Sequence, residues 1–122
     1  MKKVLVVDDS PSVRQQVGLA LKQAGFEILE AVDGVDGVAK IDGDPNIGVV
    51  ICDVNMPRMN GLELVETVHR KPQHANLPIV MLTTEGQPQL IQRAKKAGAK
   101  GWIVKPFKAN LLVAAVKKLM PA

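Results

Sequence analysis

The chain has 122 residues, 47% of them hydrophobic, which predicts one compact domain that buries a single core. Its lone cysteine, Cys52, excludes an intramolecular disulfide, and no apolar run approaches the ~20 residues that span a bilayer. The net charge of +4 is uneven, because residues 1–85 hold 8 basic and 12 acidic residues whereas residues 86–122 hold 8 basic and none acidic.

The first predicted strand covers residues 3–7 and runs directly into Asp8 and Asp9. Two lysines, Lys2 and Lys3, precede its four apolar residues, which are too few for the apolar part of a signal sequence, so we expect a cytoplasmic protein. Ser10 is a predicted N-cap for the following helix, which carries Pro11 in its first turn and ends at Gly25.

The rest of the chain repeats this alternation of short apolar runs and longer stretches of helical period. We expect further strands over 27–31, 48–52, 79–83 and 101–104, and further helices over 34–41, 62–69 after an Asn60 cap, 88–97 and 109–119. Five strands that alternate with five helices predict an α/β fold, a doubly wound parallel sheet with helices on both faces.

Polar residues stand where four of these strands end. Ligands of open parallel sheets bind outside the carboxyl ends of the strands, so these side chains are expected at one rim. They are Asp8, Asp9, Asp53, Thr83 and Lys105. Three carboxylates at close range need a cation, and hard oxygen ligands suit Mg²⁺ or Mn²⁺. Zinc is not expected, since we place His69 and His74 in solvent, away from this rim.

This combination predicts phosphoryl transfer. Asp53 is the candidate nucleophile and would form an acyl-phosphate, while Asp8 and Asp9 are better suited to hold the metal. Lys105 can pair with a phosphate oxygen and the Thr83 hydroxyl can donate to the same group. Simpler interpretations also exist, because acids favour a helix N-terminus and a lysine at a strand end can be merely solvated.

The motifs then point to a family. They are Asp-Asp-Ser at 8–10, Asp53 followed by Met-Pro at 56–57 and Gly61, Thr-Thr at 83–84, and Lys-Pro-Phe at 105–107. Each is weak alone, but in this order the chain resembles response-regulator receiver domains of two-component signalling, in particular stand-alone chemotaxis receivers of the CheY type. The resemblance covers residues 1–122 and implies a flavodoxin-like sheet of order 2-1-3-4-5 with no output domain.

The resemblance also implies roles for single residues. Asp53 corresponds to the phosphate acceptor, and Asp8, Asp9 and the backbone carbonyl of Asn55 to the metal ligands. Thr83 and Lys105 correspond to the phosphate-binding pair, with a cis peptide bond before Pro106. Asn55 and Glu85 occupy the places that tune dephosphorylation. Trp102 takes the place of the family's aromatic switch, where tyrosine or phenylalanine is more familiar, although its ring could also simply fill space.

The expected function is therefore a phosphorylation-driven signalling switch with Mg²⁺, and not an enzyme that acts on metabolites. Its expected partners are a histidine kinase or phosphotransfer domain and a target with an acidic docking surface, which would face the basic residues 86–122. We expect a monomer that binds neither nucleic acid nor membrane. Two alternatives stay open: a phosphatase of haloacid-dehalogenase type, which also uses a strand-end aspartate with Mg²⁺, and a flavodoxin-like cofactor carrier.

Overall fold

A computed structural model describes residues 3–56, 58–84 and 88–120 of the chain. Five parallel strands form one sheet in the order β2-β1-β3-β4-β5. Their bounds are β1 Lys3–Val7, β2 Glu27–Ala31, β3 Ile47–Asp53, β4 Ile79–Thr83 and β5 Gly101–Val104. The predicted fold class and strand order are confirmed.

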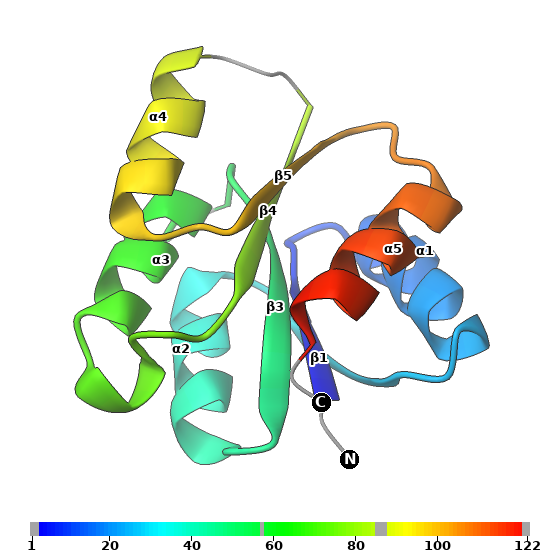
Figure 1. Ribbon diagram of the computed structural model, residues 1–122, viewed down its shortest axis with the longest axis horizontal. Coiled ribbons are helices and arrows are strands. Elements are labelled where there is room, and N and C mark those ends of the chain that lie inside the picture. Colours follow the sequence, from blue (N-terminus) through cyan, green and yellow to red (C-terminus); the bar gives the residue numbers. More distant parts are fainter. Residues whose placement is uncertain (1–2, 57, 85–87, 121–122) are drawn as a thin grey trace.

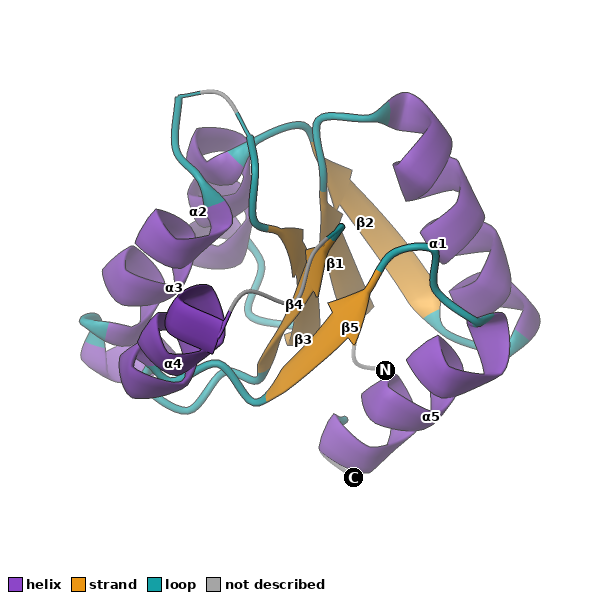
Figure 2. Ribbon diagram, turned by 90° about the horizontal axis from the view of Figure 1, so that it is seen from above, coloured by secondary structure: helices purple, strands orange, loops and turns teal. Residues whose placement is uncertain are grey.

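The described residues also form five α-helices and a short 3₁₀ helix, which connect the strands except for the last α-helix, which follows β5. Their bounds are α1 Pro11–Gln23, α2 Gly34–Gly43, α3 Gly61–His69, η1 Pro72–His74, α4 Pro88–Ala97 and α5 Ala109–Leu119. Figures 1 and 2 show α1 and α5 on one face of the sheet and α2, α3 and α4 on the other. This is the two-sided arrangement that right-handed crossovers between parallel strands require.

The helix ends follow the predicted capping residues. The Ser10 side chain accepts a hydrogen bond from the Val13 backbone N–H, and Asn60 and Glu63 form a reciprocal capping box. The chain leaves α1 at Gly25, whose φ of 97° lies in the left-handed region that favours glycine. These local signals explain why the helices begin and end close to the predicted positions.

The sheet separates two apolar clusters. Alternate residues of the central strands point to opposite faces, so Val50 and Met81 pack toward α2, α3 and α4, whereas Val49 and Val80 pack toward α1 and α5. All seven residues of β3 are buried, as a central parallel strand covered on both faces should be. This packed frame fixes the positions of the strand ends.

The structure corrects the expectation that His69 and His74 lie in solvent. The His69 ring is partly buried, with Nδ1 3.0 Å from the Ala97 carbonyl oxygen and Nε2 2.8 Å from that of Leu77. His74 Nε2 lies 3.1 Å from Asp42 Oδ1. Both histidines thus join segments that are distant in the sequence. Among the described helices, none combines the length and the apolar character needed to cross a bilayer.

Candidate phosphoacceptor and metal site

The carboxyl ends of β1 and β3 bring three aspartates together. Asp53 is the last residue of β3, and Asp8 and Asp9 directly follow β1, the neighbouring strand. Carboxylate oxygens of Asp8, Asp9 and Asp53 all lie within 4.8 Å of one another. Asp8 and Asp53 are buried, whereas Asp9 is exposed. One side of the cluster is therefore open to an incoming group.

Lys105 supplies the positive charge of this rim from the segment after β5. Its Nζ lies 3.1 Å from Asp8 Oδ2 and 3.1 Å from Asp53 Oδ1. The side chains of Asp8, Asp53 and Lys105 are only 2%, 8% and 17% exposed, so water screens these charges weakly. The peptide bond between Lys105 and Pro106 is cis, as the resemblance implied.

Burial and the neighbouring charges shift the pKa values of Asp53 and Lys105. Burial, followed by the nearby charge of Asp8, raises the pKa of the Asp53 carboxyl, although Lys105 opposes this shift. Burial alone would lower the pKa of Lys105, but its hydrogen bond with Asp53 and the charges of Asp53 and Asp8 outweigh burial and raise that pKa. At Asp53, burial and the neighbouring carboxylates together outweigh the effect of Lys105 on the pKa.

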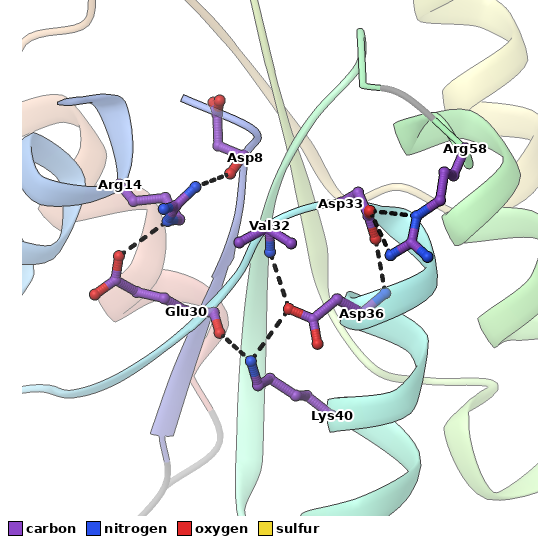
Figure 3. Close-up of polar contacts among 8 residues, drawn as sticks. All are labelled: Asp8, Arg14, Glu30, Val32, Asp33, Asp36, Lys40 and Arg58. Atoms are coloured by element: carbon purple, nitrogen blue, oxygen red, sulfur yellow. Dashed lines mark hydrogen bonds and ion pairs between the residues drawn. The ribbon is translucent and has the colours of Figure 1, made fainter. Parts of the chain in front are cut away.

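The β1–α1 junction holds Asp8 in place. The Ser10 N–H donates to Asp8 Oδ1 over 2.9 Å, and Arg14 Nη1 donates to the Asp8 backbone carbonyl over 2.6 Å. Figure 3 shows Arg14 between Asp8 and Glu30, with which it forms an ion pair. The sequence gives no signal for this contact of Arg14, because its partner atom on Asp8 belongs to the backbone.

The segment between Asp53 and α3 carries Asn55, which is exposed. The Val54 carbonyl accepts a hydrogen bond from Gly61 N–H over 2.9 Å, which brings the ends of this segment together. A Cβ atom at Gly61 would lie 2.2 Å from the Asp53 carbonyl oxygen, so only glycine fits so close to the acceptor residue. Close packing against the Asp53 backbone therefore explains why the family motif has glycine at position 61.

The remaining predicted site residues lie as follows. Thr83 ends β4, is 2% exposed, and belongs to the strand next to that of Asp53. Glu85 lies outside the described residues. Trp102 lies in β5, beside Met81, and its indole Nε1 is buried with no hydrogen-bond partner among the described residues. The rim thus joins Asp8, Asp9, Asp53 and Lys105, while Trp102 packs against the core cluster that contains Ala94.

The donor set fits a hard divalent cation. It is built from carboxylate oxygens, and burial together with the charge of Asp8 raises the pKa of Asp53, a penalty on its ionised form that a bound cation would offset. The only described cysteine, Cys52, is buried, and burial raises the pKa of its thiol, so it is no thiolate ligand. The histidines contact Leu77, Ala97 and Asp42 instead of this cluster.

The geometry also bears on the two alternatives. A haloacid-dehalogenase-type phosphatase needs a second acid two residues after its nucleophile, and here that residue is Asn55. A flavodoxin-like carrier needs a Ser/Thr/Gly-rich phosphate loop after the first strand, where this chain has Asp-Asp-Ser-Pro-Ser. Neither alternative accounts for the cluster of three aspartates with Lys105.

Comparisons with known proteins agree with this interpretation. The family described as Response regulator receiver domain matches residues 4–117. The chain is 43% identical over 111 residues to chemotaxis protein CheY1 of Helicobacter pylori, covering 90% of each protein. It is 41% identical to a chemotaxis protein CheY homolog of Campylobacter jejuni, covering 90% of this chain and 85% of that protein.

Solved structures give the same result. Chemotaxis protein CheY4 of Vibrio cholerae superposes with a TM-score of 0.92 at 44% identity, covering 98% of this chain and 99% of that chain. A putative response regulator from Chloroflexus aurantiacus gives a TM-score of 0.90 at 32% identity, with 98% of each chain covered. The chain therefore belongs to the response regulator receiver family, the phosphorylation-activated switches of two-component signalling, and is of the CheY type.

Proposed function

We propose that this protein is a chemotaxis signalling switch that accepts a phosphoryl group on Asp53 with the help of Mg²⁺. The observation that carries the proposal is the meeting of Asp8, Asp9 and Asp53 within 4.8 Å, with Lys105 in contact with two of them. The names of its relatives support the chemotaxis role. We further propose that it acts in the cytoplasm as a monomer.

The proposed step begins at the Asp53 carboxylate. One of its oxygens attacks phosphorus in a phosphohistidine of a kinase or phosphotransfer domain. A P–O bond forms as the P–N bond breaks, and the electron pair of that bond leaves with the imidazole, which takes up a proton. Lys105 Nζ, now 3.1 Å from Asp53 Oδ1, would donate to a phosphoryl oxygen, and we assign the same role to the hydroxyl of Thr83, at the end of the neighbouring strand.

The metal would be held by the side chains of Asp8, Asp9 and Asp53 and by the backbone carbonyl of Asn55. When bound, Mg²⁺, or Mn²⁺ in its place, neutralises charge on the phosphoryl oxygens. Ser10 N–H and Arg14 keep Asp8 oriented, as Figure 3 shows for Arg14. Two hydrogen bonds, from Ser10 and from Arg14, thus support Asp8, a proposed metal ligand, before any metal binds.

We propose that the only reactions of the protein itself are self-phosphorylation by small phosphodonors and autodephosphorylation. In the second reaction, water attacks phosphorus, and the Asp53 carboxylate leaves with the electron pair of the broken P–O bond. Asn55, exposed two residues after Asp53, and Glu85 would set how readily that water approaches. The aspartyl phosphate would then be short-lived.

The output is proposed to be a change in partner binding at the basic part of the chain. Arg93, Lys95, Lys96, Lys100, Lys108, Lys117 and Lys118 are all exposed on or beside α4 and α5. Val104 and Leu111 are exposed apolar residues of the same part of the chain. A target with an acidic docking surface would match this charge, and salt would weaken its association.

The experiment is an intact-mass measurement after the protein is mixed with acetyl phosphate and Mg²⁺. We expect one added phosphoryl group, and none after chelation of the metal. A parallel assay with a small phosphomonoester tests the alternative, since steady hydrolysis of that substrate would identify a phosphatase. Absence of any added phosphoryl group on the folded protein would contradict the proposed function.

A further inference from the structure

An ion pair between a buried aspartate and an exposed arginine joins two loops beside the phosphoacceptor rim. The side chain of Asp33, in the β2–α2 loop, is 7% exposed, and that of Arg58, in the β3–α3 loop, is 60% exposed. Arg58 approaches Asp33 Oδ2 with two nitrogens, Nη2 at 2.6 Å and Nε at 2.7 Å. Figure 3 shows the guanidinium facing the Asp33 carboxylate. A fork of two donors fixes direction as well as distance.

Asp33 is a rigid anchor for this contact. As the N-cap of α2, it accepts a hydrogen bond from the Asp36 N–H over 2.9 Å. That bond, and then those to Arg58, lower the pKa of Asp33, so it is ionised at neutral pH. The Asp36 side chain in turn accepts from Val32 N–H and from Lys40, which also donates to the Glu30 carbonyl (Figure 3).

A backbone contact reinforces the ion pair at the same place. Gly34 N–H donates to the Met59 carbonyl over 3.1 Å. A Cβ atom at Gly34 would lie 2.4 Å from that carbonyl oxygen, so the two loops touch backbone to backbone. The N-terminus of α2 therefore contacts residues 58 and 59, which belong to the loop that leads from Asp53 to α3.

Arg58 adopts an unusual backbone conformation in this loop. Its φ of 65° lies in the left-handed region, which is uncommon for residues other than glycine and asparagine. The backbone conformation therefore does not favour arginine at this position. The contact of its side chain with Asp33 accounts for an arginine here. The ion pair spans 25 positions in the sequence and is made by the side chain alone.

The β3–α3 loop, which the Asp33–Arg58 ion pair holds, also carries Asn55, three residues before Arg58. We propose that Asp33 and Arg58 are positioning residues that hold the β3–α3 loop so that the Asn55 backbone carbonyl faces the metal. The inference rests on the proposed metal site. A carbonyl ligand, unlike a carboxylate, can be aimed only through the conformation of its backbone, so a support outside the ligand set determines its contribution to affinity.

The experiment measures Mn²⁺ binding directly, by the electron paramagnetic resonance signal of the free ion, without any phosphodonor. Arg58→Asn removes the fork and keeps a residue that tolerates positive φ. Asp33→Asn removes the charge and keeps an acceptor for the α2 N-cap. Lys71→Asn is the matched control, because it breaks an ion pair of 2.6 Å with Asp42, at the opposite end of the sheet. Circular dichroism checks that each variant is folded.

We expect either loop variant to bind Mn²⁺ about tenfold more weakly, the lower range for loss of an outer partner of a metal ligand. The double variant should be no weaker than the singles, because both remove one interaction. The control should bind like the wild type. Wild-type affinity in folded Arg58→Asn protein, or losses that add in the double variant, would overturn the positioning role alone. A wild-type protein that binds no Mn²⁺ would overturn the metal site and the positioning role together.

Discussion

Lys105 Nζ lies 3.1 Å from Asp53 Oδ1 and 3.1 Å from Asp8 Oδ2, so one cation contacts carboxylates at the ends of two different strands. Since all three side chains are largely buried, the lysine is held beside Asp53, the proposed phosphate acceptor. In the proposed reaction, the Lys105 amine that now contacts Asp53 would donate to a phosphoryl oxygen instead. The following expectations depend on this arrangement.

Lys105→Met should slow phosphorylation by acetyl phosphate about 100-fold, as loss of one preorganised donor does elsewhere. The matched control is Lys100→Met, because Lys100 is an exposed lysine of the same basic segment away from the rim. The measurement is the rate of phosphoryl addition at saturating Mg²⁺. Equal rates of phosphoryl addition in the two variants would show that Lys105 has no role in phosphorylation.

Asp9→Asn should stabilise the protein when no divalent metal is present. The charge of Asp9 is one of those that raise the pKa of Asp53, so its removal relieves repulsion among the clustered carboxylates. We expect a gain on the order of 1 kcal/mol, a few degrees in Tm. Mg²⁺ should stabilise the wild type more than the variant, since Asp9 is a proposed ligand. A variant less stable than the wild type in a chelator would contradict this expectation.

The Asp33 carboxyl should make stability depend on pH in a defined direction. Its pKa is lowered in the folded protein, first by the Asp36 N–H and then by Arg58, so its contribution is present above the unfolded value near 3.8. That contribution is lost as pH falls through the lowered folded pKa. The difference in unfolding free energy between wild type and Asp33→Asn should therefore be constant near neutrality and shrink in acid. A difference in unfolding free energy that grows in acid would contradict a lowered pKa of Asp33 in the folded protein.

Trp102 should report the change of state through its fluorescence. Its indole N–H is buried without a described partner, and its ring lines a cavity of about 70 Å³ with Ile91, Ala94, Lys95, Ala99, Lys100 and Gly101. An unpaired buried donor is costly, so this rotamer should change easily. In the proposed switch, Thr83 moves toward the phosphoryl group and leaves space beside β5 for the ring. Beryllofluoride with Mg²⁺ should change the emission of the wild type but not of Asp53→Asn. Unchanged emission in both would indicate that the ring only packs.

The sequence was sufficient for the fold because its signals are local. Continuous apolar runs such as Val49 to Cys52 mark buried parallel strands, and Ser10, Asn60 and Gly25 mark helix ends. The parallel arrangement then places the ends of β1, β3 and β4 at one rim. Asp8, Asp53 and Thr83 could therefore be assigned to that rim without any knowledge of side-chain contacts.

What could not be predicted depends on partners that are distant in the sequence or belong to the backbone. His69 resembled a surface residue, because nothing in the sequence shows that the carbonyls of Leu77 and Ala97 flank its ring. Asp33 stands before a helical stretch and could have been recognised as an N-cap. Its pairing with Arg58 leaves no sequence signal, since it arises from how two loops meet.

The most direct test of the central claim is to locate the phosphoryl group. Protein treated with acetyl phosphate and Mg²⁺ is reduced with borohydride, which converts an aspartyl phosphate to homoserine, and its peptides are analysed by mass spectrometry. We expect homoserine at position 53, and none at position 8 or 9 or in protein treated with a chelator. Homoserine at Asp8 or Asp9 with an unmodified Asp53 would contradict the assignment of Asp53 as the acceptor.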